Sequence, residues 1–131
     1  MADTVLQRKN MVESQIRPSD VTDRRITAAM TSIPREAFLP KQLASIAYSD
    51  ESLTLGPGRE VLSPRVLAKL IQLAAFEATD SVLVVSAAGY AAAVVAEMVG
   101  KVTALLPDQE SATIAGSGFA ASALSNAVAV T

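Results

Sequence analysis

The sequence predicts an α/β protein in which an N-terminal helical segment precedes a partial parallel sheet of order β-α-β-α-β. Three observations lead to this prediction. Residues 82–85 form a continuous, mostly β-branched apolar run, which is typical of a strand buried on both faces. Two further strand candidates, 101–106 and 127–130, each follow a helical stretch. In residues 1–47, apolar side chains recur at helical spacing and prolines divide the run.

The composition excludes several classes of function. With 131 residues, the chain suits one compact unit, which we expect to comprise an N-terminal helical and loop segment over 1–63 and a sheet segment over 64–131. There is no Cys and no His, so we expect no metal site. A net charge of −2 and an aromatic content of 4% give no footprint for nucleic acid.

Charge is unevenly distributed along the chain. Residues 1–60 hold eight of the 11 basic and eight of the 13 acidic residues, whereas residues 111–131 carry no charge. That uncharged stretch has the length of a membrane span, but Ser, Thr, Asn and Gly interrupt it, so we expect no span. Asp3 precedes any apolar run, which is atypical of a signal peptide. We therefore expect a soluble, cytoplasmic protein.

The first elements are predicted as helices separated by prolines. Residues 5–16 form a loosely amphipathic pattern that ends before Pro18. The polar residues 19–23 favour a helix N-cap. Residues 26–33 then carry apolar side chains at i, i+3, i+4 and i+7, and Pro34 ends this helix.

A loop and a third long helix follow. Pro40 begins or breaks a short helix, and residues 48–59 predict a loop with a Gly-Pro-Gly turn. Pro64 suits the first position of a helix. We expect the buried stripe of this helix to consist of Val66, Leu70, Leu73 and Ala74.

The back half alternates strands and helices. Residues 86–89 read Ser-Ala-Ala-Gly and connect the first strand to an Ala-rich helix. A weaker, Gly-interrupted helix over 111–124 lies between the second and third strand candidates. Such consecutive βαβ units build a doubly wound, Rossmann-like sheet, which binds nucleotides at the turn after its first strand.

Specific motifs in the front half resemble the opening of the protein-L-isoaspartate O-methyltransferase family. The most specific of them is Pro-Arg-Glu-x-Phe-x-Pro over residues 34–40. The resemblance runs in order through nearly the whole chain, over residues 11–16, 23–26, 29–30, 33–40, 47–50, 53–58, 81–93 and 101–108. It implies a class I S-adenosylmethionine-dependent methyltransferase fold with an added N-terminal helical segment. The implied activity is methylation of the abnormal carboxylate that forms when Asn or Asp residues isomerise in ageing proteins.

The resemblance also implies where the substrate should bind, and this chain departs there. The family follows its Gly-x-Gly turn with Gln-Thr-Ile-Ser-x-Pro, whereas this chain has Glu60 at the Thr position and Leu62 at the Ser position. Leucine cannot hydrogen-bond a substrate carboxylate, and glutamate repels one. Ser63, one position away, is our candidate catalytic residue if the protein is active.

The family's cofactor turn is changed as well. The family has an acidic residue followed by Gly-x-Gly-x-Gly, whose glycines let the cofactor approach the backbone. Here Val84 stands at the acidic position, only Gly89 remains, and the turn is one residue short. Ser86, Ala87 and Gly89 are therefore our candidate cofactor-binding residues in a degenerate turn.

A third departure lies at the end of the second strand. In such folds an acid there accepts hydrogen bonds from the ribose hydroxyls, but Leu106 occupies this place. We expect Asp108 to face the start of the next helix as a cap. Loss of the ribose contact costs on the order of 1–3 kcal/mol. We therefore expect the protein to bind no cofactor. If the protein is active, the cofactor that the resemblance implies is S-adenosylmethionine.

Three hypotheses follow for the function. We expect a truncated, inactive methyltransferase-like protein that acts as an accessory or structural subunit of a larger assembly. In that case, a protein partner covers the open edge of the first strand. The alternatives are an active, divergent protein-L-isoaspartate O-methyltransferase that uses Ser63, and a small domain that dimerises through the exposed strand edge.

Overall fold

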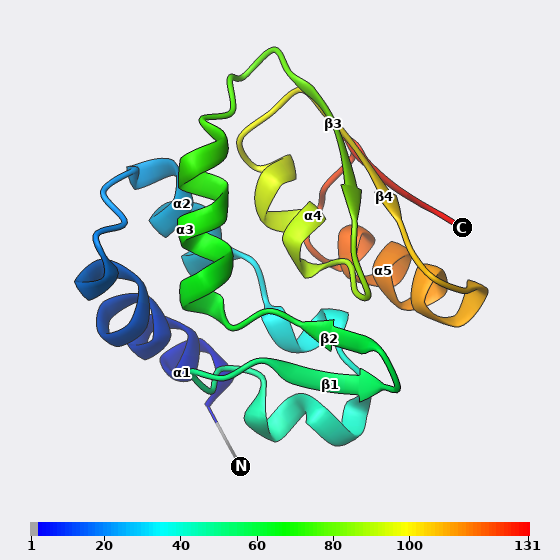
Figure 1. Ribbon diagram of the computed structural model, residues 1–131, viewed down its shortest axis with the longest axis horizontal. Coiled ribbons are helices and arrows are strands. Elements are labelled where there is room, and N and C mark those ends of the chain that lie inside the picture. Colours follow the sequence, from blue (N-terminus) through cyan, green and yellow to red (C-terminus); the bar gives the residue numbers. More distant parts are fainter. Residues whose placement is uncertain (1–2) are drawn as a thin grey trace.

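The computed structural model describes residues 3–131 (Figure 1). Its elements are α1 (Thr4–Met11), a π-helical turn (Val12–Ile16), a 3₁₀ turn (Arg17–Ser19), α2 (Arg24–Ser32), two 3₁₀ segments (Arg35–Phe38 and Lys41–Ile46), β1 (Leu53–Gly56), β2 (Arg59–Val61), α3 (Pro64–Ala74), β3 (Ser81–Val85), α4 (Tyr90–Ala96), β4 (Lys101–Leu105), α5 (Gln109–Ala121) and β5 (Ala127–Val130). The predicted fold class is confirmed, because a helical segment precedes a three-stranded parallel sheet.

The helix α2 forms where the sequence predicts it. The side chain of Asp23 caps the helix by accepting a hydrogen bond from the Arg25 amide at 3.0 Å. Ile26 and Met30, on the predicted apolar face, are completely buried. Ile33 is extended, as expected for a residue before proline, and ends the helix.

The expected loop over 48–59 contains a short hairpin instead. Strands β1 and β2 pair antiparallel, with Leu53 opposite Val61. Gly58 adopts a φ of 70° in the connection, a left-handed conformation that glycine adopts without steric cost. The alternation of Leu53, Thr54 and Leu55 is too short for the sequence to distinguish a strand from a polar loop.

Helix α3 begins at Pro64 as predicted, but its buried stripe is a different one. Besides Pro64 itself, the buried side chains are those of Leu67, Ala68 and Ile71, on the side where α3 contacts the N-terminal helices. All four members of the predicted stripe, Val66, Leu70, Leu73 and Ala74, are instead exposed, Leu73 to 82%. The helix carries apolar residues on two adjacent faces, so periodicity alone could not decide which face packs inward.

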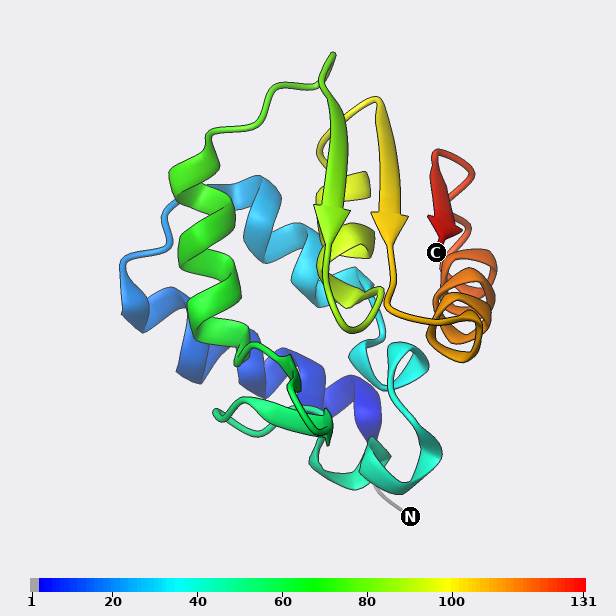
Figure 2. The ribbon, with the colours of Figure 1, turned by 45° about the vertical axis from the view of Figure 1, so that its right-hand side comes forward.

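The parallel sheet has the strand order β3-β4-β5, with β3 at one edge (Figure 2). Both connections are right-handed βαβ crossovers that progress in the same direction across the sheet, so α4 and α5 cover the same face. On that face Val102 and Ala104 of β4 are completely buried. Their burial joins the sheet to the common core of the molecule.

The opposite face of the sheet is open. Leu83 and Val85 of β3 are 61% and 71% exposed, and Val128 and Val130 of β5 are also exposed. The register aligns Leu83 with Thr103 and Val128 in one row across the three strands. The prediction that β3 is buried on both faces is therefore wrong for the described residues. The composition of β3 is typical of a strand that is buried on both faces, but in this structure helices cover only one face of the sheet.

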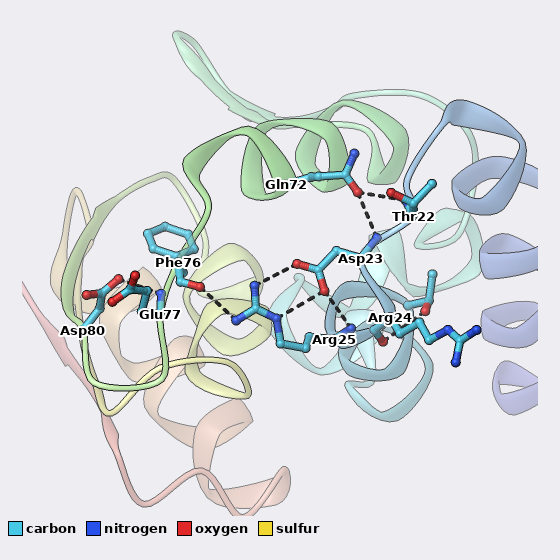
Figure 3. A network of polar contacts seen from close by, with 9 residues as sticks. Thr22, Asp23, Arg24, Arg25, Gln72, Phe76, Glu77 and Asp80 are labelled. Atoms are coloured by element: carbon cyan, nitrogen blue, oxygen red, sulfur yellow. Dashed lines mark hydrogen bonds and ion pairs between the residues drawn. The ribbon is translucent and has the colours of Figure 1, made fainter.

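A polar network joins the start of α2 to the end of α3 (Figure 3). The Gln72 Oε1 atom accepts hydrogen bonds from the amides of Thr22 and Asp23, at 2.8 and 3.0 Å. Arg25 donates to the Phe76 carbonyl at 2.8 Å and to the Asp23 carboxylate at 2.8 Å. This network fixes the segment that leads from α3 into β3.

Candidate functional site

The candidate site lies at the carboxyl ends of β3 and β4, where open parallel sheets bind ligands. Three hollows of about 400, 180 and 100 Å³ adjoin this edge. Ala87, in the turn after β3, lines all three of them. Leu106 lines the largest, Glu60 and Leu62 line the second, and Asp108 lines the smallest.

The turn after β3 satisfies its own polar groups. The Ser86 hydroxyl donates a hydrogen bond to the Ala88 carbonyl at 2.7 Å. The Ser86 amide donates to the Leu105 carbonyl of the neighbouring strand at 3.3 Å. Of the three predicted cofactor-binding residues, Ala87 lines all three hollows, Ser86 lines two of them and Gly89 lines none. The hydroxyl and the amide of Ser86 are nevertheless engaged within the protein.

Gly89 is explained by packing between helices. Its φ of −82° is accessible to any residue, so backbone conformation does not require glycine there. A Cβ atom at this position would lie 2.7 Å from the Cβ of Ala115 in α5 and 3.1 Å from the Phe38 ring. The space that glycine leaves is therefore filled by α5 and Phe38, and it is not a cradle for a ligand.

Apolar side chains occupy the two positions where the resemblance implies acids. Leu106 follows β4 and is buried, and its amide donates to the Val130 carbonyl at 2.8 Å. Val84 is half-buried and packs against the core. At these positions no side-chain oxygen is present to accept a hydrogen bond from a ribose. The two residues do not fit the cofactor-binding roles that the family assigns to their positions.

Asp108 is nearby, but its carboxylate is already engaged. It caps α5 by accepting hydrogen bonds from the amide and hydroxyl of Ser111, at 2.8 and 2.6 Å. Its other oxygen pairs with Arg59 of β2 at 2.5 Å. The bonds from Ser111, followed by the bond from Arg59, hold the pKa of Asp108 well below its usual range. The sequence predicted the cap, but it gave no signal for the Arg59–Asp108 ion pair between distant segments.

The candidate catalytic residue Ser63 is the N-cap of α3. Its hydroxyl oxygen accepts a hydrogen bond from the Val66 amide at 3.4 Å, and the residue is buried. Among the described residues, Ser63 lines none of the three hollows at the sheet edge. The structure therefore does not bring Ser63 together with Ser86 and Ala87 in one hollow.

Sequence reasoning missed a buried cation behind the site. Arg35 is completely buried, and its guanidinium donates to the carbonyls of Ala47 at 2.6 Å and Leu62 at 3.0 Å. The same guanidinium stacks on the Tyr90 ring, 4.7 Å from the centroid. The Pro-Arg-Glu-x-Phe-x-Pro motif that contains Arg35 was the available signal. Its arginine links the loop before α3 to the start of α4.

Burial shifts the pKa values around this arginine. Desolvation lowers the pKa of Arg35 and raises the pKa of Tyr90 to about 12. It also raises the pKa of Tyr48, whose hydroxyl donates to the Glu36 carboxylate and accepts from the Arg35 amide. Both tyrosines therefore stay neutral at physiological pH. Tyr48 acts through its hydroxyl, whereas Tyr90 packs its ring against the Arg35 guanidinium.

Comparison with known proteins decides the family. The family model for protein-L-isoaspartate(D-aspartate) O-methyltransferase matches residues 6–128. The chain belongs to this family.

Two kinds of feature are absent from the residues that the structure describes. Among them, no group of three or more His, Cys, Asp or Glu side chains that could hold a metal ion occurs. Likewise, none of the described helices is long and apolar enough to cross a membrane.

Individual family members support the assignment. The chain is 38% identical over 119 residues to protein-L-isoaspartate O-methyltransferase 1 of Rhodopseudomonas palustris strain HaA2. This match covers 86% of this chain and 49% of that protein. It is 43% identical over 97 residues to protein-L-isoaspartate O-methyltransferase 2 of Anaeromyxobacter sp. strain Fw109-5, covering 73% of this chain and 40% of that protein. The chain therefore spans about half the length of these curated relatives.

Solved structures of the family share the fold. One protein-L-isoaspartate O-methyltransferase superimposes with a TM-score of 0.77 at 24% identity, over 94% of this chain and 41% of that one. A Plasmodium falciparum protein described by the same family name, in complex with S-adenosyl-L-homocysteine, gives a TM-score of 0.72 at 16% identity, over 94% of this chain and 62% of that one. At these identities, the likeness establishes the fold alone.

Proposed function

We propose that this protein-L-isoaspartate O-methyltransferase family member does not bind S-adenosylmethionine tightly. In this proposal it acts in the cytoplasm as an accessory or structural subunit of a larger protein assembly. The observation that carries the proposal is the sheet edge, where Leu106 is buried in place of a ribose-binding acid. The nearest carboxylate, that of Asp108, is committed to Ser111 and Arg59. The space beside Gly89 is filled by α5.

The open side of the sheet supports the second part of the proposal. A groove of about 270 Å³ runs between α3 and the edge strand β3, and every residue that lines it is apolar. The backbone groups on that edge of β3 have no strand beside them among the described residues. We propose that an extended apolar segment of a partner protein pairs with β3 here, because such a strand would satisfy the edge and bury Leu70 and Val85.

Cofactor binding is tested by isothermal titration calorimetry with S-adenosylmethionine. We expect no binding with a Kd below about 10 μM, which corresponds to roughly 7 kcal/mol. A relative such as the Rhodopseudomonas palustris protein, titrated in parallel, controls for the quality of the ligand. Binding at or below that Kd would refute the proposed loss of cofactor binding.

The names of the relatives favour a second candidate function. In this alternative, the protein is an active, divergent protein-L-isoaspartate O-methyltransferase that depends on Ser63. Its test is transfer of a radiolabelled methyl group to an isoaspartyl peptide, compared between wild type, Ser63→Ala and Ser63→Asp. Aspartate preserves the N-cap of α3 but lacks the hydroxyl, so equal loss in both variants would assign the effect to the hydroxyl. No transfer by wild type would exclude this alternative.

A further inference from the structure

One of the three hollows at the sheet edge carries a single, unpaired charge. This hollow, of about 180 Å³, lies between β2, the first turn of α3 and the turn that leads from β3 into α4 (Figure 1). Among its lining residues, only Glu60 is charged. Glu60 is exposed, and its carboxylate forms no ion pair within the part of the chain that the structure describes. The neighbouring Arg59 pairs with Asp108 and so does not neutralise it.

The walls around this carboxylate are mostly apolar. The larger apolar side chains that line the hollow are those of Val61, Leu62, Leu67 and Val85. Leu62 and Val85 are exposed, so a ligand in the hollow can reach them. The volume is smaller than that of drug-sized sites, which measure about 300–1,000 Å³, and it therefore suits a ligand of only a few heavy atoms.

The hollow continues into the apolar groove between α3 and β3. Leu67, Val85 and Ala91 line both of them. The groove measures about 270 Å³, and no polar side chain lines it. An apolar chain that starts at Glu60 can therefore extend over these three residues into the groove.

The charge of Glu60 favours a cation, and its surroundings narrow the class of cation. Glu60 repels a ligand carboxylate, and Arg35, which donates to the Leu62 carbonyl, is completely buried and cannot contact an anion in the hollow. A divalent metal ion takes several oxygen ligands, whereas one carboxylate lines this hollow. A quaternary ammonium ion binds aromatic cages, but Tyr90 is buried and its ring is stacked on Arg35. A primary ammonium group fits, because it donates hydrogen bonds to a carboxylate.

We propose that this hollow binds a primary alkylammonium ion, which is a small amine with an unbranched apolar chain. The ammonium group donates hydrogen bonds to the Glu60 carboxylate, and the alkyl chain packs on Leu62, Leu67 and Val85. Hydrogen bonds between ionised groups are stronger than those between neutral groups, and each buried methylene adds to the affinity through the hydrophobic effect. The proposal requires neither S-adenosylmethionine nor a partner at β3, so it goes beyond the proposed function.

The test is an NMR titration of the whole ¹⁵N-labelled chain with five probes at one ionic strength: n-butylammonium, n-hexylammonium, butyrate, n-butanol and tetramethylammonium. We expect saturable shifts in residues 60–62 and 85–91 with n-butylammonium, with a Kd on the order of 1–10 mM. We expect n-hexylammonium to bind at least threefold more tightly, because two further methylenes enter the groove. The other three probes should bind at least threefold more weakly than n-butylammonium. Binding of any of these three within threefold of n-butylammonium, or shifts only elsewhere, would overturn the proposal.

Matched variants localise the interaction. Glu60→Gln removes the charge at nearly constant size, and we expect it to weaken n-butylammonium binding at least threefold. Glu110→Gln is the control, because Glu110 is also an exposed carboxylate at the sheet edge but lines a different hollow. Ala91→Leu narrows the passage into the groove and should remove the advantage of n-hexylammonium over n-butylammonium. Unchanged binding by Glu60→Gln contradicts the proposal whether or not Ala91→Leu folds. No nucleoside or methyl donor is present, so the outcome is separate from those of the cofactor and methylation tests.

Discussion

At the residue scale, several positions that suggest ligand chemistry in the sequence serve packing in the structure. Gly89 contacts Ala115 and Phe38, and Gly118 of α5 lies so close to the Phe38 ring that a Cβ would be 2.4 Å from it. Phe38 also packs at an angle against Tyr90 and Phe119. This aromatic cluster fills the space between the start of α4 and α5. The lack of a side chain at Gly89 and Gly118 leaves room for the Phe38 ring.

Alanine substitutions separate packing from conformational preference. Gly89→Ala is expected to lower the free energy of unfolding by about 1–3 kcal/mol, because the new methyl overlaps Ala115. Gly116→Ala, in the same α5 but with open space around it, is expected to raise it by about 0.5–1 kcal/mol. Urea unfolding measures both. Equal effects of the two substitutions would contradict the packing explanation of Gly89.

Arg35 gives a second prediction at this scale. Arg35→Lys keeps the charge but cannot reach the Ala47 and Leu62 carbonyls while also stacking on Tyr90. We expect it to lower the free energy of unfolding by about 1–3 kcal/mol. The exposed Arg24→Lys is the control and should change it by less than about 0.5 kcal/mol. Similar stabilities of the two variants in urea unfolding would show that the guanidinium fork is not required.

At the element scale, the segments that the sequence predicted best have a cap at one end and a proline at the other. Helix α2 has Asp23 and Pro34 as its boundaries, so local chemistry defines it. The hairpin β1–β2 and the inward face of α3 were mispredicted, since tertiary contacts decide both. At the candidate site, the sequence identified the apolar substitutions and the Asp108 cap. It could not reveal the Arg59–Asp108 pair, whose members are brought together only by the fold.

The cap of α2 makes stability depend on pH. The hydrogen bond from the Arg25 side chain lowers the pKa of Asp23 below its usual value of 3.8. The contribution of the Asp23 carboxylate to the free energy of unfolding is therefore fully present above pH 3.8, and it is lost as the pH falls through the lowered pKa. Urea unfolding at pH 6, 4 and 2 should show Asp23→Asn less stable than wild type at pH 6, with the difference shrinking at pH 2. A difference that is constant with pH would contradict this assignment.

At the scale of the whole molecule, the core and the open face lie on opposite sides of the parallel sheet. On the helix side of the sheet, Val102 and Ala104 of β4 are completely buried and the residues of the two outer strands are partly buried. The other side presents an apolar row from Val85 to Val130, and beside it a row in which Thr103 separates Leu83 from Val128. Contiguous apolar surface of this kind marks an interaction site or an aggregation hazard. The open face and the groove beside α3 adjoin, so one partner could cover both.

Light scattering tests the role of this surface. We expect the 131-residue chain by itself to associate in a concentration-dependent manner, and the double variant Leu83→Lys with Val85→Lys to be monomeric over the same range. Ser81→Lys adds charge at an exposed polar position of the same strand and should associate like wild type. A monomeric wild type at all concentrations would count against this surface, and against dimerisation through the strand edge.

The buried position of Leu106 also constrains any attempt to engineer the site. Introducing an acid there would place a carboxylate among apolar neighbours, and burying an unpaired charge is costly. A longer turn would also have to keep glycine at position 89, because a Cβ there would lie 2.7 Å from Ala115 and 3.1 Å from Phe38. Each single step toward a nucleotide-binding edge therefore destabilises the scaffold before it contributes any affinity. An engineer would have to change the turn, Leu106 and the aromatic cluster together.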